Sequence, residues 1–179
     1  IQRLVGSEMC IRDSFLSDLG GYESHSSEQN FLSNFFFNMS MFVFALVGIA
    51  FLWIPQLFRE DTLNWYLSCL GSFFLFIGTL FFAGVGLTPY DLYLDIHIFF
   101  ALNAFRLMVP GCLCFLIVLL RSNVQKRYAF IAGFYLFSVV AYVCYQLLST
   151  GNPFEDINEM IRQATIQKII VILSVISVL

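Results

Sequence analysis

Four apolar stretches long enough to cross a bilayer constrain the fold of this chain more than any other feature. A spanning helix needs about 20 mostly apolar residues. The four stretches cover residues 34–57, 65–87, 96–120 and 129–148, and a fifth begins near Ile169. The composition agrees, because 59% of the residues are hydrophobic and only 12% are charged. The sequence therefore predicts an all-α protein, a polytopic transmembrane helix bundle with five of an expected six helices present.

The N-terminal residues resemble a translated sequencing adapter. Residues 4–13, Leu-Val-Gly-Ser-Glu-Met-Cys-Ile-Arg-Asp, follow codon for codon a transposase-type library adapter used in shotgun sequencing, and Ser14 fits the next bases. Such scars are left out of fold reasoning. We therefore expect 1–14 to be an adapter-derived artefact and 15–179 a single transmembrane helical domain, a metagenomic fragment incomplete at both ends. A genuine polar N-terminus is the alternative.

The last apolar stretch, residues 169–179, is too short to span a bilayer core of about 30 Å at about 1.5 Å per residue. One explanation is that the helix begins as early as Asn158 and just reaches across. The favoured one is that the chain is truncated. In that case the polar segment 156–168, with apolar residues at helical spacing, is expected to form a short amphipathic helix on the outer surface.

Charges in the connecting segments predict the topology. Segments 58–64 and 121–128 fall on one side and carry most of the bases: Arg59, Arg121, Lys126 and Arg127. Segments 15–33, 88–95 and 149–167 fall on the other and are mostly acidic. Lysine and arginine favour the cytoplasmic side. The sequence thus predicts a multi-pass protein of the plasma membrane, with the 121–128 loop cytoplasmic and the 88–95 loop external. A cytoplasmic N-terminus would then require an odd number of further helices before residue 15, and one is the simplest count.

Arg106 is the strongest candidate functional residue. It lies about 15 Å into its span, where an arginine costs roughly 2.5–3.5 kcal/mol and usually faces the bundle interior or water. On the same helix only Asn103, at i−3, offers a polar neighbour. The next span carries hydroxyls at helical spacing: Tyr135, Ser138, Tyr142, Tyr145 and Ser149. We predict that Arg106 points at this stripe and that tyrosine rings hold its guanidinium. A snorkelling arginine, and tyrosines used only for packing, are the alternatives.

His97 is the second candidate. It heads a face of small residues that includes Gly111, which suits close helix packing, so a hydrogen-bonded interfacial histidine is one interpretation. The other is a binding or acid–base group acting with Asp18, Asp91 or Asp95. The histidines show no paired spacing, and the cysteines within the spans suit packing, so no metal, haem or other cofactor is expected.

Several short motifs carry a family resemblance. They are Leu16-Ser17-Asp18-Leu19-Gly20, Phe37-Asn38, Gly84-Val85-Gly86-Leu87-Thr88-Pro89, and His97 with Ala101 a turn later. In this order they resemble the uncharacterised prokaryotic six-helix membrane proteins of domain-of-unknown-function family 998 and, more distantly, the eukaryotic DRAM-like family. The resemblance covers residue 15 to the C-terminus. It implies six helices with both ends cytoplasmic, no established reaction, and a weak link to lipid handling and membrane trafficking.

Three functions remain open at this stage. The first is a non-enzymatic binder of a membrane lipid or small amphiphile, with Arg106 holding a phosphate or carboxylate. The second is a membrane-embedded lipid-modifying enzyme that uses His97 and the aspartates, although no nucleophile stands beside them. The third is a small transporter, which would need more broken helices than Pro110 alone provides. We favour the first. Nucleic-acid binding is excluded because basic residues are few and scattered, and the oligomeric state is open.

Overall fold

A computed structural model describes residues 15–23, 29–149, 151 and 156–178. Within these residues the chain is helical, as predicted. A short 3-10 helix, η1 (Leu16–Gly20), precedes α2 (Phe31–Gly48), which continues through η2 (Ile49–Leu52) and η3 (Ile54–Phe58). Four long helices follow: α3 (Thr62–Leu87), α4 (Leu94–Arg121), α5 (Lys126–Leu148) and α6 (Ile157–Val178). The adapter-like residues 4–13 lie outside the described part of the chain.

Five helical segments are long and apolar enough to cross a membrane. They are α2 with its 3-10 extension, α3, α4, α5 and α6. The all-α transmembrane bundle predicted from the sequence is therefore confirmed. The number and length of the apolar helices are those of a multi-pass integral membrane protein. The four predicted complete spans agree with α2–η3, α3, α4 and α5 to within a few residues at most ends.

The prediction of a separate surface helix over 156–168 is wrong. Residues Ile157–Val178 form one continuous helix, α6, whose span begins at the earlier of the two predicted positions. Its first turns are polar, yet they pack against α5 because Glu159 finds partners there. Further along, Ala164 and Ile170 are buried. The polar residues at the start of α6 form hydrogen bonds with α5 and its end, so this segment can pack in the bundle and does not have to lie on the membrane surface.

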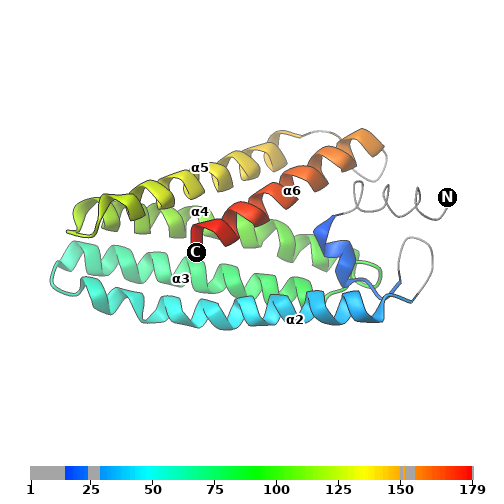
Figure 1. The fold of residues 1–179 in the computed structure, drawn as a ribbon, viewed down its shortest axis with the longest axis horizontal. Helices are drawn as coiled ribbons and strands as arrows, with labels where there is room; N and C mark the ends of the chain where they lie inside the picture. The colour runs from blue at the N-terminus through cyan, green and yellow to red at the C-terminus, as the bar shows by residue number, and fades with distance from the viewer. Residues whose placement is uncertain (1–14, 24–28, 150, 152–155, 179) are drawn as a thin grey trace.

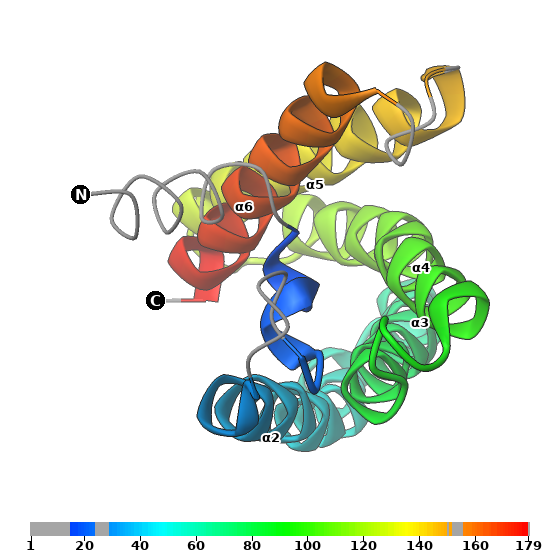
Figure 2. The same ribbon diagram turned by 90° about the vertical axis from the view of Figure 1, so that its right-hand side faces the viewer.

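The helices form a single row that bends into an arc (Figures 1 and 2). Each helix packs against the next along the chain, with α3 between α2 and α4, and α5 between α4 and α6. Helix η1 contacts both α2 and α6 and lies in the mouth of the arc between them, at one end of the bundle (Figure 2). We call this end the η1 end. The α3–α4 connection lies there too, whereas the α4–α5 connection lies at the opposite end (Figure 1).

Small residues allow the closest approach between α3 and α4. A Cβ added to Gly111 would lie 2.7 Å from the side chain of Leu75, and one added to Gly78 would lie 3.4 Å from the carbonyl oxygen of Ala104. Ser68 and Ser72 are buried on the same side of α3. Ser68 donates its hydroxyl to the Trp65 carbonyl of its own helix, so its burial leaves no unpaired donor. The small-residue faces of α3 and α4 thus meet at a helix–helix interface, as expected for the face that includes Gly111.

Apolar side chains of α3, α4, α5 and α6 form the core. Its buried members are Leu75, Phe105, Met108, Cys112, Val139, Tyr142 and Ile170. Phe105 packs edge-on against Tyr142, with ring centroids 4.8 Å apart. The core therefore lies along α4, and α2 adds the partly buried Phe44 at its edge.

At the end opposite η1, polar contacts fasten α3 to α4. The Asp61 carboxylate accepts a hydrogen bond from the Asn64 N–H at 2.9 Å and so caps the start of α3. Arg121 donates to the Asn64 side chain at 3.0 Å and pairs with Asp61 at 3.5 Å. The Asn64 N–H, with the charge of Arg121 adding to it, holds the pKa of Asp61 below its ordinary value. The Lys126 ammonium donates to the Leu120 carbonyl and closes the α4–α5 turn.

Candidate functional site

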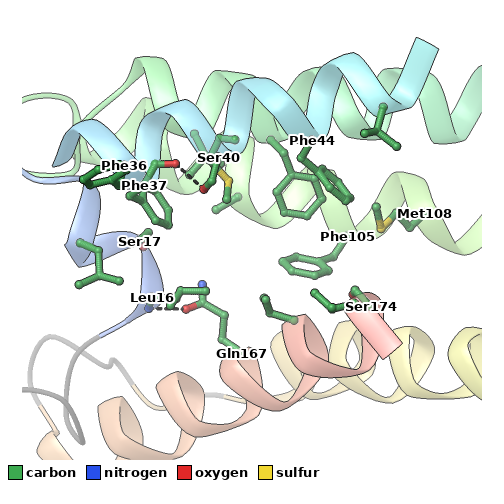
Figure 3. Close-up of a pocket in the computed structure, with 18 of the residues that line it drawn as sticks. Leu16, Ser17, Phe36, Phe37, Ser40, Phe44, Phe105, Met108, Gln167 and Ser174 are labelled. Carbon is green, nitrogen blue, oxygen red and sulfur yellow. Dashed lines mark hydrogen bonds between the residues drawn. The ribbon is translucent and has the colours of Figure 1, made fainter. Parts of the chain in front are cut away.

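A cavity of about 710 Å³ opens between α2 and α6, beneath η1 (Figure 3). Its volume falls in the range of roughly 300–1,000 Å³ typical of small-molecule sites. Side chains from η1, α2, α3, α4 and α6 line it. Most of them are aliphatic or aromatic, including Phe37, Phe44, Phe82, Phe105, Met108, Val171 and Val175. We call this space the α2–α6 groove.

Helix η1 closes one end of the groove because both neighbouring helices hold it. The Leu16 N–H donates to Gln167 Oε1 of α6 at 2.9 Å. On the other side, the Asn34 side chain of α2 donates to the Gly20 carbonyl at 2.5 Å, and Ser33 donates to the Leu19 carbonyl at 3.1 Å. Without these bonds the η1 backbone would lack partners near an apolar surface. These bonds hold η1 across one end of the groove.

The polar atoms of the groove fall into two groups. Ser33, Ser40 and Ser174 donate to backbone carbonyls, and Ser174 also bonds the Tyr135 hydroxyl at 3.0 Å. Ser17 and Gln167, both at the η1 end, have hydrogen-bonding capacity to spare (Figure 3). Among the described residues that line the groove, none carries a charge. The groove is therefore apolar along most of its length and polar at one end.

Arg106 lies outside this groove. It is half-buried, and its Nε is shielded from solvent without a hydrogen-bond partner. At 100° per residue it shares a row of α4 with Phe99, Leu113 and Ile117, whose side chains are all exposed. This row faces away from the core of the bundle. Asn103, the neighbour proposed to help it, donates to the Phe99 carbonyl on the same exposed side.

The predicted contact between Arg106 and the tyrosine stripe is wrong. The Tyr135 hydroxyl bonds Met108 Sδ and Ser174, and the Tyr145 hydroxyl bonds Glu159, so their partners lie on α4 and α6. Tyr142 packs against Phe105 in the core. Among the described residues, Arg106 makes no hydrogen bond, ion pair or cation–π contact. The tyrosines of the stripe do face inward, as predicted, but they contact α4 and α6.

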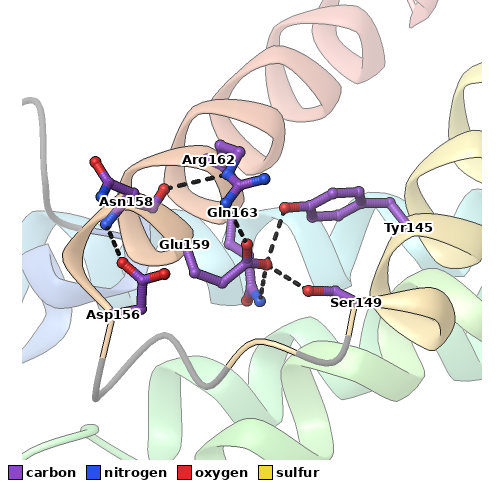
Figure 4. A network of polar contacts seen from close by, with 7 residues as sticks. All are labelled: Tyr145, Ser149, Asp156, Asn158, Glu159, Arg162 and Gln163. Carbon is purple, nitrogen blue, oxygen red and sulfur yellow. Dashed lines mark hydrogen bonds and ion pairs between the residues drawn. The ribbon is translucent and has the colours of Figure 1, made fainter.

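The Glu159 cluster joins α5 to α6 at the η1 end (Figure 4). Glu159 is 4% exposed, and its Oε1 accepts hydrogen bonds from the Tyr145 hydroxyl at 2.9 Å, from Gln163 Nε2 at 3.0 Å and from the Ser149 hydroxyl. Its Oε2 pairs with Arg162, whose own side chain is mostly exposed. Every oxygen of this carboxylate is therefore satisfied, which makes the cluster a structural link.

His97 is a hydrogen-bonded interfacial residue. It is 4% exposed, and its Nδ1 lies 2.6 Å from the Thr88 carbonyl oxygen. Because a carbonyl only accepts, Nδ1 carries a proton. Nε2 is buried without a hydrogen-bond partner in the described part of the chain. Neither ring nitrogen bonds a carboxylate of the described residues.

The three candidate aspartates do not converge on one point. Asp18 accepts the Phe15 N–H at 2.8 Å within η1. Asp91 accepts the Tyr22 and Glu23 N–H groups and so ties the segment after η1 to the α3–α4 loop. Asp95 is exposed in the first turn of α4, where a negative charge favours the helix start. Two of the three thus hold backbone in place.

Sequence reasoning missed the groove. Its lining residues, such as Phe44, Phe105 and Val171, are of the same types as the residues that face lipid elsewhere. One residue in the sequence does point to the groove: Gln167, a polar amide in the middle of the apolar helix α6. The expectation of a surface helix over 156–168 places Gln167 outside the membrane and hides this signal.

Comparison of the chain with protein-family models, with curated proteins and with solved structures found no match.

Proposed function

We propose that this chain is a non-enzymatic membrane protein that binds a single-chain amphiphile in the α2–α6 groove. The observation that carries the proposal is the groove itself, an apolar cavity of about 710 Å³. Its polar atoms without a hydrogen-bond partner, on Ser17 and Gln167, lie at one end. An acyl or alkyl chain buried there gains contact with aromatic and aliphatic side chains. The polar end offers hydrogen bonds to a headgroup.

The geometry supports binding over catalysis. A lipid-modifying enzyme needs an acid–base pair or a nucleophile within hydrogen-bond reach of a reacting atom. His97 bonds the Thr88 carbonyl, Asp91 bonds backbone N–H groups, and neither lines the groove. A binding site needs only shape, apolar surface and a few polar groups, and the groove has all three.

Photocrosslinking tests this function. The protein is reconstituted in phosphatidylcholine nanodiscs with a long-chain alcohol that carries a diazirine in its alkyl chain. We expect the crosslinks to map to groove residues such as Phe44, Phe105 and Met108, and to be competed by the unlabelled alcohol. Crosslinks confined to exposed residues such as Phe137 would contradict binding in the groove.

The substitution Ala101→Phe provides the matching variant. Ala101 lines the groove, so a phenyl ring there should occupy the space of the alkyl chain and lower groove crosslinking by about tenfold or more. The control is Ala141→Phe, the same change on the exposed face of α5. It should leave crosslinking at the wild-type level. Equal loss in both variants, or in neither, would count against the groove as the binding site.

We propose the family 998-like and DRAM-like relationship on the short motifs given above, and the plasma membrane as the location. We also propose that the end of the bundle opposite η1 is cytoplasmic. The α4–α5 connection and its flanks carry Arg121, Lys126 and Arg127, and positive residues favour that side. A cysteine placed at Asn123 should therefore resist an impermeant thiol reagent in intact cells and react after permeabilisation. Labelling of that cysteine in intact cells would reverse the orientation.

A further inference from the structure

The spare hydrogen-bonding groups of the groove are confined to its η1 end. Gln167 uses Oε1 to accept the Leu16 N–H, and because an N–H must face an acceptor, this fixes the orientation of the amide. Its Nε2 is then a donor with no acceptor among the described residues. Ser17, on η1 and nearly buried, contributes a hydroxyl that forms no hydrogen bond with them. Figure 3 shows both side chains at the end where η1 crosses the groove, with Phe105 and Met108 further in.

The rest of the groove offers no free hydrogen-bond donor to a headgroup among the described residues. Ser40 and Ser174 give their hydroxyl protons to the Phe37 and Ile170 carbonyls of their own helices. Between and around them the lining is aromatic and aliphatic. A headgroup oxygen placed there would lose its hydration without a donor to replace it. An amphiphile is therefore oriented with its polar end at Ser17 and Gln167 and its chain toward Met108.

The charge of the site restricts the headgroup. No charged side chain lines the groove among the described residues, and Arg106, the cation first considered for a phosphate or carboxylate, lies on the opposite side of α4. A sulfate, phosphate or carboxylate seated beneath η1 would have no counter-charge. An uncharged oxygen, by contrast, can accept from Gln167 Nε2 and exchange a hydrogen bond with the Ser17 hydroxyl.

We propose that the groove selects single-chain lipids with an uncharged, hydroxyl-bearing headgroup, and that Gln167 and Ser17 determine this specificity. The inference rests on the proposed function, since it names the class of amphiphile that the same groove takes. The class includes long-chain alcohols and monoacylglycerols.

Three photoactivatable probes with the same alkyl chain test this specificity: an alcohol, an alkyl sulfate and an alkylphosphocholine. In nanodiscs we expect the alcohol to crosslink to the groove at least about tenfold more efficiently than either charged probe. Equal crosslinking of all three would overturn the headgroup inference and leave amphiphile binding intact. Crosslinking of none would overturn the binding function. The two failures are therefore distinguishable.

Variants of Ser17 and Gln167 separate specificity from structure. The Ser17 hydroxyl forms no hydrogen bond within the described residues, so Ser17→Ala should lower crosslinking of the alcohol severalfold while thermal unfolding stays near that of the wild type. Gln167→Met removes both the Nε2 donor and the acceptor of the Leu16 N–H, so it should lower the alcohol preference and also loosen η1. A Ser17→Ala protein that keeps the wild-type preference among the three probes would overturn the role of the hydroxyl.

Discussion

The substitution Gly48→Ala should destabilise the bundle by about 1–3 kcal/mol, the usual cost of overpacking a tight interface. Gly48 ends α2 where that helix crosses α3, and a Cβ there would overlap the Thr79 hydroxyl and lie 2.7 Å from the Thr79 Cβ. Thr79 cannot give way easily. It is 1% exposed, its hydroxyl bonds the Phe76 carbonyl at 2.7 Å, and a β-branched side chain in a helix has little rotamer freedom. Helix α2 must therefore move away from α3.

Gly133→Ala is the matched control for this prediction. A Cβ at Gly133 would lie 3.7 Å from Leu116, an ordinary van der Waals distance. Here the higher helix propensity of alanine should dominate and stabilise the protein by up to about 1 kcal/mol. Denaturant titration in mixed micelles measures both variants. If Gly48→Ala also stabilised the protein, α2 and α3 would not approach each other as closely as this structure has them.

A double substitution tests the cause. Thr79→Gly removes the side chain that a Cβ on Gly48 meets, so Gly48→Ala combined with Thr79→Gly should cost less than the sum of the two single changes. Such coupling is expected only for residues in direct contact. Additive costs would mean that the penalty at Gly48 comes from its own backbone and not from Thr79.

The close helix–helix interfaces could be predicted because they require small residues, which are visible in the sequence. Gly71, Ser72 and Gly78 recur on one side of α3, and only small side chains permit two helices to approach so closely. The structure buries all three. The hydropathy of each span likewise located the helices, since a lipid-exposed backbone must be hydrogen-bonded within its own segment.

The candidate site was less predictable because periodicity identifies a face of a helix but not the neighbour that the face meets. The stripe of Tyr135, Tyr142 and Tyr145 was correctly expected to face inward. Its partners include Ser174 and Glu159 on α6, the helix whose start the sequence places on the membrane surface. Without those partners, the sequence offers only Arg106 as a polar partner for the stripe. An error in one helix thus became an error in the site.

Glu159→Ala should give a clear fall in stability, several degrees in the midpoint of thermal unfolding. Glu159 Oε1 accepts three hydrogen bonds from the side chains of Tyr145, Ser149 and Gln163. Truncation removes the common acceptor and leaves donors on both helices unpaired in a buried place, which costs more than losing the bonds alone. Because Tyr145 lies on α5 and Ser149 caps its end, the link between α5 and α6 should loosen first. Hydrogen exchange should therefore rise at the start of α6.

Two further variants separate the role of Glu159 as a hydrogen-bond acceptor from the role of its negative charge. Glu159→Gln keeps an oxygen at the position of Oε1, so it can still accept all three bonds, and it gives up only the pairing of Oε2 with Arg162. Arg162→Ala removes the same ion pair from the other side. Since Arg162 is mostly exposed, that pair contributes little. Both variants should therefore unfold close to the wild-type temperature, well above Glu159→Ala. If Glu159→Gln fell as far as Glu159→Ala, the negative charge and not the shared acceptor would join α5 to α6.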